Sequence, residues 1–312
     1  SMKGSSDIPR DIEKGLSMFR LAVEQNYKAA TRDLARYYYS LETEEDNRKA
    51  LDYYLQYIEY NPKDTDTLLH IGLIYESGLG VPLNIDLARR YYERAAEQDE
   101  TGMAYNFLGG TYMNDEETES NERKAVHYFQ KAIELGNTNA MFRISYYLHN
   151  GKGGLQVDIP REIELLTEAS KRGNHQATYR LGLLFEDNES GMAQNLELSV
   201  KYFQLAADNG ILAAINKMGE LYLFGEVIPA NLTKAISCFT AASEQGYGKA
   251  SYWLGRLHTD GIGQLEKDTQ KAMNYYRKAI EQGYEEAREW MEQLQKNLVD
   301  ETITDIEIPQ DK

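Results

Sequence analysis

Small and apolar residues return along this chain every 36 or 37 residues, in one register from end to end. A small residue opens each copy, and these residues are Ala30, Thr67, Ala104, Ala140, Ala177, Ala214, Ala250 and Ala287. Four positions later each copy has Leu, Ile or Met, and in five copies a glycine follows directly. A repeat of this length, whose units bury their apolar faces only against their neighbours, predicts a solenoid.

The first half of each copy has the pattern of an amphipathic helix. In the copy that begins at Ala104, Leu108 and Tyr112 follow at spacings of four and eight, which places all three on one helix face. Glycine inside a helix costs about 1 kcal/mol relative to alanine. Its return at one register position therefore predicts that another helix crosses there too closely for a Cβ; the five glycines are Gly72, Gly109, Gly182, Gly219 and Gly255.

The second half predicts a helix that packs aromatic side chains inward. Lys-Ala precedes a pair of aromatic residues in several copies, as in Lys49-Ala50 before Tyr53-Tyr54. The other pairs are Tyr91-Tyr92, Tyr128-Phe129, Tyr202-Phe203 and Tyr275-Tyr276. A glycine follows this helix in five copies, at Gly136, Gly173, Gly210, Gly246 and Gly283. Glycine there predicts a left-handed cap residue that ends the helix.

The segment Glu76-Ser-Gly-Leu-Gly-Val81, placed between the two helix patterns, resembles the loop of a Sel1-like repeat, a relative of the tetratricopeptide repeat. The resemblance covers residues 10–298 and implies an all-α fold, a right-handed αα-superhelical solenoid of about seven to eight two-helix repeats. Residues 1–9 are then an N-terminal extension that begins with Ser1-Met2, which looks like the scar of a cleaved tag. Residues 299–312 form an acidic tail, expected to be disordered or, alternatively, to fold back as an extended strap.

Charge restricts the kinds of partner. Fifty acidic and 34 basic residues give a net charge of −16, which repels phosphate backbones and anionic membranes and so disfavours nucleic acid and lipid headgroups. No stretch has transmembrane length, and none resembles a signal peptide. A cytoplasmic protein is favoured, with secretion or export left open because a leader could have been trimmed. The single cysteine, Cys238, falls on a core-facing position and is expected to be a buried packing residue.

The sequence gives no positive support to catalysis, to a metal site or to a cofactor. None of the five histidines forms a helical His-Glu-His pattern, and no cysteine cluster exists. No Gly-rich phosphate loop follows a strand, and no serine lies in a nucleophile elbow. His258 replaces the aromatic residue of its first helix and is expected to pack rather than to bind a ligand.

Solenoids of the resembling class present their first helices along a concave surface where partners bind, so the resemblance implies a site there. Three consecutive copies have a basic residue three positions after the small residue, namely Arg143, Arg180 and Lys217. The same face or its rim also has Tyr146, His149, Tyr179, Glu186, Asn216, Glu220, Tyr252 and Arg256. Because arginine forms charge-assisted bonds with carboxylates, this basic ladder predicts a ligand with acidic side chains or a free carboxy-terminus.

The function expected from these residues is that of a non-catalytic scaffold or adaptor, which binds a peptide segment of a partner protein on the face of the first helices. Three alternatives stay open. The ladder residues could pair with acidic residues of adjacent repeats and serve packing alone. The chain could be a structural module that self-assembles through its terminal repeats. It could also be a hydrolase that uses carboxylates of the groove.

Overall fold

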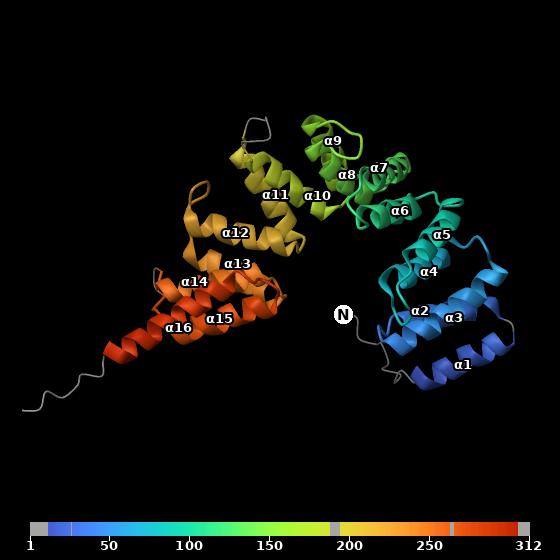
Figure 1. The fold of residues 1–312 in the computed structure, drawn as a ribbon, viewed down its shortest axis with the longest axis horizontal. Coiled ribbons are helices and arrows are strands. Elements are labelled where there is room, and N and C mark those ends of the chain that lie inside the picture. Colours follow the sequence, from blue (N-terminus) through green and yellow to red (C-terminus); the bar gives the residue numbers. More distant parts are fainter. Residues whose placement is uncertain (1–11, 26, 188–193, 263–264, 305–312) are drawn as a thin grey trace, which may run out of the picture. The chain divides into compact units, whose positions relative to one another are not determined.

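The computed structural model describes residues 12–25, 27–187, 194–262 and 265–304. Within them the chain forms sixteen α-helices. Loops join successive helices, as Figure 1 shows. They are α1 (Ile12–Glu24), α2 (Lys28–Tyr39), α3 (Glu44–Tyr60), α4 (Thr65–Ser77), α5 (Ile85–Ala96), α6 (Met103–Met113), α7 (Glu119–Glu134), α8 (Thr138–Asn150), α9 (Ile159–Lys171), α10 (His175–Glu186), α11 (Leu196–Asp208), α12 (Leu212–Phe224), α13 (Leu232–Glu244), α14 (Gly248–Asp260), α15 (Thr269–Glu281) and α16 (Ala287–Thr304). The all-helical prediction is confirmed.

Successive helices pair as the repeat predicts. The first helix of each repeat, termed helix A, has an even number, and the second, termed helix B, has the odd number that follows. The two helices contact each other in α2 with α3, α4 with α5, α6 with α7, α10 with α11, α12 with α13 and α14 with α15. Helix B of one pair also packs on helix A of the next, as α3 does on α4 and α11 on α12. The internal contacts divide the chain into two compact units, residues 1–162 and 163–312, which are described separately.

The glycine inside helix A lies directly under an aromatic ring of helix B. A Cβ built on Gly109 would lie 2.6 Å from the ring of Phe129, and one on Gly182 would lie 2.6 Å from the ring of Phe203. Gly72, Gly219 and Gly255 face Tyr92, Phe239 and Tyr276 in the same way. The predicted close crossing is confirmed, because each of these five rings is fully buried.

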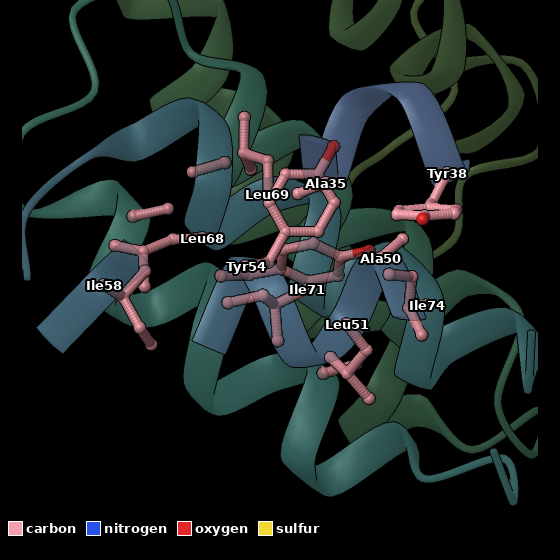
Figure 2. Packing of buried hydrophobic residues seen from close by; sticks show 14 of the residues in the cluster. Ala35, Tyr38, Ala50, Leu51, Tyr54, Ile58, Leu68, Leu69, Ile71 and Ile74 are labelled. Atoms are coloured by element: carbon pink, nitrogen blue, oxygen red, sulfur yellow. The ribbon is translucent and has the colours of Figure 1, made fainter. Parts of the chain in front are cut away.

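The core of each unit is built around these buried rings. In the first unit, Tyr54 of α3 lies among aliphatic side chains that include Leu51, Leu69 and Ile71, as Figure 2 shows. Burying one aromatic side chain contributes about 1.5–3 kcal/mol to folding relative to leaving it exposed. The second residue of the aromatic pair therefore holds helix B on helix A in the repeats that have such a pair.

The first residue of the pair packs on the edge of the core, where it stacks on an aromatic residue of helix A. Phe185 and Tyr202 have ring centroids 5.6 Å apart and planes within 5°. The same near-parallel stack joins Tyr38 with Tyr53, Tyr75 with Tyr91, Tyr112 with Tyr128, and His258 with Tyr275. In these five repeats helix A and helix B are thus held by one buried ring and one stacked pair.

The partly buried position of His258 predicts that the stability of the second unit depends on pH. Burial lowers the pKa of His258, and the charge of Lys271 lowers it further, against the opposing effect of Asp268. The unfolded chain then binds the proton more readily than the folded chain once the pH falls below the ordinary histidine value of about 6.5. We expect the free energy of unfolding to decrease as the pH falls from 7.5 to 5.5.

Replacement of His258 separates its contribution to the pH dependence of stability from that of the other groups that titrate at acidic pH. His258→Tyr restores the ring that other repeats have at this position and removes the titrating group. Urea denaturation at several pH values should give a shallower decrease for this variant than for the parent. If the free energy of unfolding decreased equally with falling pH in both proteins, His258 would not contribute to the pH dependence.

The last helix extends beyond the boundary expected from the sequence. α16 continues to Thr304, whereas the repeat region was expected to end at residue 298. The sequence from Leu298 to Thr304 contains neither glycine nor proline, so nothing in it stops a helix. Residues 305–312, the rest of the predicted tail, and residues 1–9 lie outside the described residues.

Candidate functional site

In the first unit the predicted site residues on α8 all contact the repeat around them. The Arg143 guanidinium lies against Gly110 of α6, where a Cβ would collide with it. The Tyr146 hydroxyl accepts a hydrogen bond of 2.9 Å from Lys152, whose ammonium also lies 3.4 Å from Glu122. The surface at Arg143 and Tyr146 therefore consists of side chains that are already held in place.

His149 of α8 is also held by its own surroundings. Its Nδ1 lies 3.0 Å from a carboxylate oxygen of Glu162, and that carboxylate is completely buried. A buried carboxylate needs partners of this kind, since burying an unpaired charge is costly. The geometry places His149 as a structural partner of Glu162, at the edge of the predicted binding face.

In the second unit Lys217 of α12 lies between two carboxylates. Its ammonium is 2.8 Å from Glu186 of α10 and 3.9 Å from Glu220 of its own helix. This is the pairing with an adjacent repeat that the structural alternative anticipated. At Lys217 the basic ladder is therefore neutralised within the protein.

Glu220 connects α12 with α14. One of its carboxylate oxygens accepts hydrogen bonds of 2.9 Å from Asn216 and from the Trp253 indole of α14, and Lys249 of α14 lies 2.8 Å away. Burial raises the pKa of the Tyr179 hydroxyl on α10 to about 12, and the nearby Tyr247, Glu220 and Glu186 raise it as well. Asn216, a predicted site residue, thus shares Glu220 with Lys217. Tyr179, another predicted residue, lies beside them, because its ring and the Lys217 ammonium both pack against Phe203.

Two further predicted residues, Tyr252 and Arg256, pack against the C-terminal helix. The Arg256 guanidinium lies 3.8 Å from the ring centroid of Trp290 on α16 and donates a hydrogen bond of 3.0 Å to the Tyr252 hydroxyl. Tyr252 in turn contacts the rings of Tyr284 and Trp290. The structure thus brings Tyr179, Asn216 and Lys217 together and places Tyr252 and Arg256 in a separate cluster.

A surface hollow of about 420 Å³ opens beside this network, between α10, α12 and the segment that follows α12. It is lined by Glu186, Gln194, Leu196, Lys217, Glu220, Leu221, Phe224, Glu226 and Val227. Three carboxylates face one ammonium, so the lining is net negative. Phe224 is its most exposed large apolar side chain, at 56% of its full surface.

A family model describes almost the whole chain. The Sel1 repeat matches at residues 1–27, 28–56, 67–100, 102–137, 138–174, 175–211, 212–247 and 248–284. The chain belongs to the Sel1 repeat family. Each of the last six matches coincides with one A and B helix pair of the fold.

Relatives of this Sel1 repeat protein match parts of it. The Sel1-repeat-containing protein YjcO of Escherichia coli K12 is 33% identical over 78 residues, which are 24% of this chain and 34% of that protein. A Sel1 repeat protein from Oxalobacter formigenes superimposes with a TM-score of 0.70 and 22% identity over 79% of this chain and 98% of its own. The c5321 protective antigen of uropathogenic Escherichia coli superimposes with a TM-score of 0.65 and 23% identity. The match covers 89% of this chain and 59% of the antigen. The chain thus spans about a third of the curated relative, and the two structures share its fold.

Sequence reasoning missed Phe224, although the Sel1 repeat pattern contains the signal. The corresponding position is polar in the other repeats, where it holds Ser40, Ser77, Asn114, Asn150, Asp187 and Asp260. Phe224 is the exception, and its ring contacts Trp253 edge-on at 5.6 Å. The hollow beside α12 therefore has an exposed apolar ring where the other repeats have a polar side chain.

Within the described residues there is neither a cluster of possible metal ligands nor a helix able to span a membrane. Among them, no three His, Cys, Asp or Glu side chains gather closely enough to hold a metal ion. No helix in the described ranges has the length and hydropathy needed to span a bilayer. What the site presents chemically is an apolar ring beside a network of fixed charges.

Proposed function

We propose that this Sel1 repeat protein is a non-catalytic scaffold, and that it binds a segment of a partner protein across the A helices α10, α12 and α14. The observation that carries the proposal is the exposed Phe224 ring in the hollow beside Lys217 and Glu220. Aromatic side chains at the centre of a binding surface contribute far more to affinity than the polar residues around them. The family and the fold support a binding role, since repeat solenoids serve widely as interaction surfaces.

The charges of the hollow favour a ligand different from the one expected from the ladder. Lys217 is paired with Glu186 at 2.8 Å, and Glu226 adds a further carboxylate to the lining. An acidic segment would meet this net negative surface unfavourably, whereas a segment with an apolar and a basic side chain complements it. We therefore place the apolar side chain on Phe224 and the basic one near Glu186 and Glu226.

The test is capture of partners from a lysate of the source organism by the purified protein and two variants. Phe224→Ser gives this position the polar side chain that the other repeats have, so folding should be preserved. Leu83→Ser is the matched control, because Leu83 is 63% exposed and lies in the other unit. We expect a partner that binds the parent and the control equally and binds Phe224→Ser about tenfold more weakly or worse.

A photo-crosslinking residue at position 224 and peptides tiled over the captured partner then locate the contact. A basic and apolar peptide that reproduces the capture supports the proposal. An acidic peptide whose binding is lost in Arg180→Ala/Lys217→Ala would restore the ligand expected from the ladder. Equal capture by all variants would show that the partner binds at another surface. If no partner is captured and the purified protein sediments in a concentration-dependent way, the self-assembling alternative is favoured.

A further inference from the structure

A second surface of the repeat at residues 212–247 departs from the pattern of its neighbours. In five repeats the helix A aromatic is covered by a near-parallel ring from helix B. In this repeat Tyr222 of α12 occupies the helix A position, and Cys238 of α13 stands where the covering ring would be. The thiol is half-buried rather than part of the core, contrary to the expectation from the sequence.

The smaller side chain leaves an open groove over Tyr222. A cavity of about 620 Å³ lies between α11, α12 and α13, with Leu205 and Pro229 in its walls. A second hollow of about 280 Å³ adjoins it and reaches Cys238. Both are lined by Tyr222 and Met218. The groove therefore has an aromatic and thioether floor, and the exposed Leu205 widens its apolar surface.

The charges at the rim of this groove differ from those elsewhere on the acidic protein. Lys234 lies 5.1 Å from the ring centroid of Tyr222, as the equivalent Lys49 and Lys124 lie over Tyr38 and Tyr112. Lys49 and Lys271 pair with acidic residues at the start of their own helices. At the start of α13 the N-cap is Asn231, whereas that of α15 is Asp268.

Because the N-cap of α13 is neutral and its first turn has no acidic residue, Lys234 has no counter-charge at the start of its own helix. Lys201 lies on the same rim, and neither lysine has an ion pair to another residue of the described part of the chain. With Asp208 as the single acidic residue in the lining, the groove is locally net positive. It is therefore complementary to a negative charge, on a chain whose total charge is −16.

We propose that this groove binds a partner segment that presents an aromatic side chain next to an acidic residue. The ring would stack on Tyr222, in the space that a ring of helix B fills in the five repeats with a stacked pair. The carboxylate would pair with Lys234 and Lys201 at the rim. This surface is separate from the Phe224 hollow, so it goes beyond the proposed function and does not depend on it.

Cys238 allows the proposal to be tested on the intact chain, because it is the single cysteine of the sequence. Cys238→Tyr restores the covering ring and should close the groove, whereas Cys238→Ala leaves it open. The probe is a phage-displayed library of random dodecapeptides, selected on the parent protein and depleted on Cys238→Tyr. We expect the selected peptides to share an aromatic residue beside Asp or Glu.

Affinity measurements on synthetic copies of these peptides decide the result. Binding should be unchanged in Cys238→Ala, about tenfold weaker or worse in Cys238→Tyr, and more weakly dependent on salt in Lys201→Gln/Lys234→Gln. Peptides without an aromatic residue, equal affinity for Cys238→Tyr and Cys238→Ala, or no enriched peptide would overturn the proposal.

Alkylation of Cys238 in the parent gives an answer even if Cys238→Tyr does not fold. A saturating peptide should slow the reaction of the thiol with iodoacetamide by about fivefold or more, because the stacked ring covers the sulfur. Unchanged alkylation at saturation would overturn the proposal. Dimerisation of the parent that is lost in Cys238→Tyr would overturn it too, in favour of a second copy of the chain as the occupant.

Discussion

Phe203→Ala should lower the free energy of unfolding by about 3–5 kcal/mol, the cost of removing a buried phenylalanine from a core. Phe203 is completely buried, and its ring lies over Gly182. Truncation leaves a cavity between α10 and α11 that the backbone at Gly182 cannot fill. Urea denaturation followed by far-UV circular dichroism measures the loss.

The neighbouring ring supplies the control, and the glycine supplies a second test. Tyr202→Ala removes a half-buried ring from its stack on Phe185 and should cost clearly less. Gly182→Leu alone should also destabilise the protein, because the leucine side chain would enter the space of the Phe203 ring. In the double variant Gly182→Leu/Phe203→Ala the leucine should partly fill the cavity. The loss of stability in the double variant should therefore be smaller than the sum of the two single losses. Additive losses would show that the glycine and the ring are not coupled.

Glu220→Ala should lower the free energy of unfolding by about 2–4 kcal/mol. The substitution removes the shared acceptor of Asn216 and the Trp253 indole. Asn216 is 2% exposed, and a buried donor that loses its acceptor costs about 1–3 kcal/mol. Lys249 loses its ion pair as well, which adds less because it is partly exposed.

Two further variants separate these contributions. Glu220→Gln keeps an acceptor oxygen and should lose about half as much stability or less. Glu226→Ala removes an exposed carboxylate from the same hollow and should change stability by less than about 0.5 kcal/mol. Denaturation followed by tryptophan fluorescence is suited to all three, since Trp253 donates to Glu220. Equal losses for Glu220→Ala and Glu226→Ala would contradict the role of Glu220 in joining α12 and α14.

The candidate site could be predicted only in part. The face of the A helices and the group of Tyr179, Asn216 and Lys217 followed from register positions, because residues at a helical spacing share one side. The charge of that face did not follow, because the pairing of Lys217 with Glu186 joins flexible side chains from different repeats. Phe224 and Cys238 were visible as departures from the repeat, but a departure shows a functional surface only once its exposure is known.

The sequence by itself determined the repeat, its two helices and the close crossing of ring and glycine. A position that returns every 36 or 37 residues reports a contact made in every unit, and such contacts lie between neighbours along the chain. Only the tertiary structure decided which side chains are exposed where adjacent repeats meet. The positions of loops and side chains in adjacent repeats decide whether Tyr222 is covered, whether Phe224 is buried and whether Lys217 is neutralised. The repeat pattern does not specify the distances between these groups.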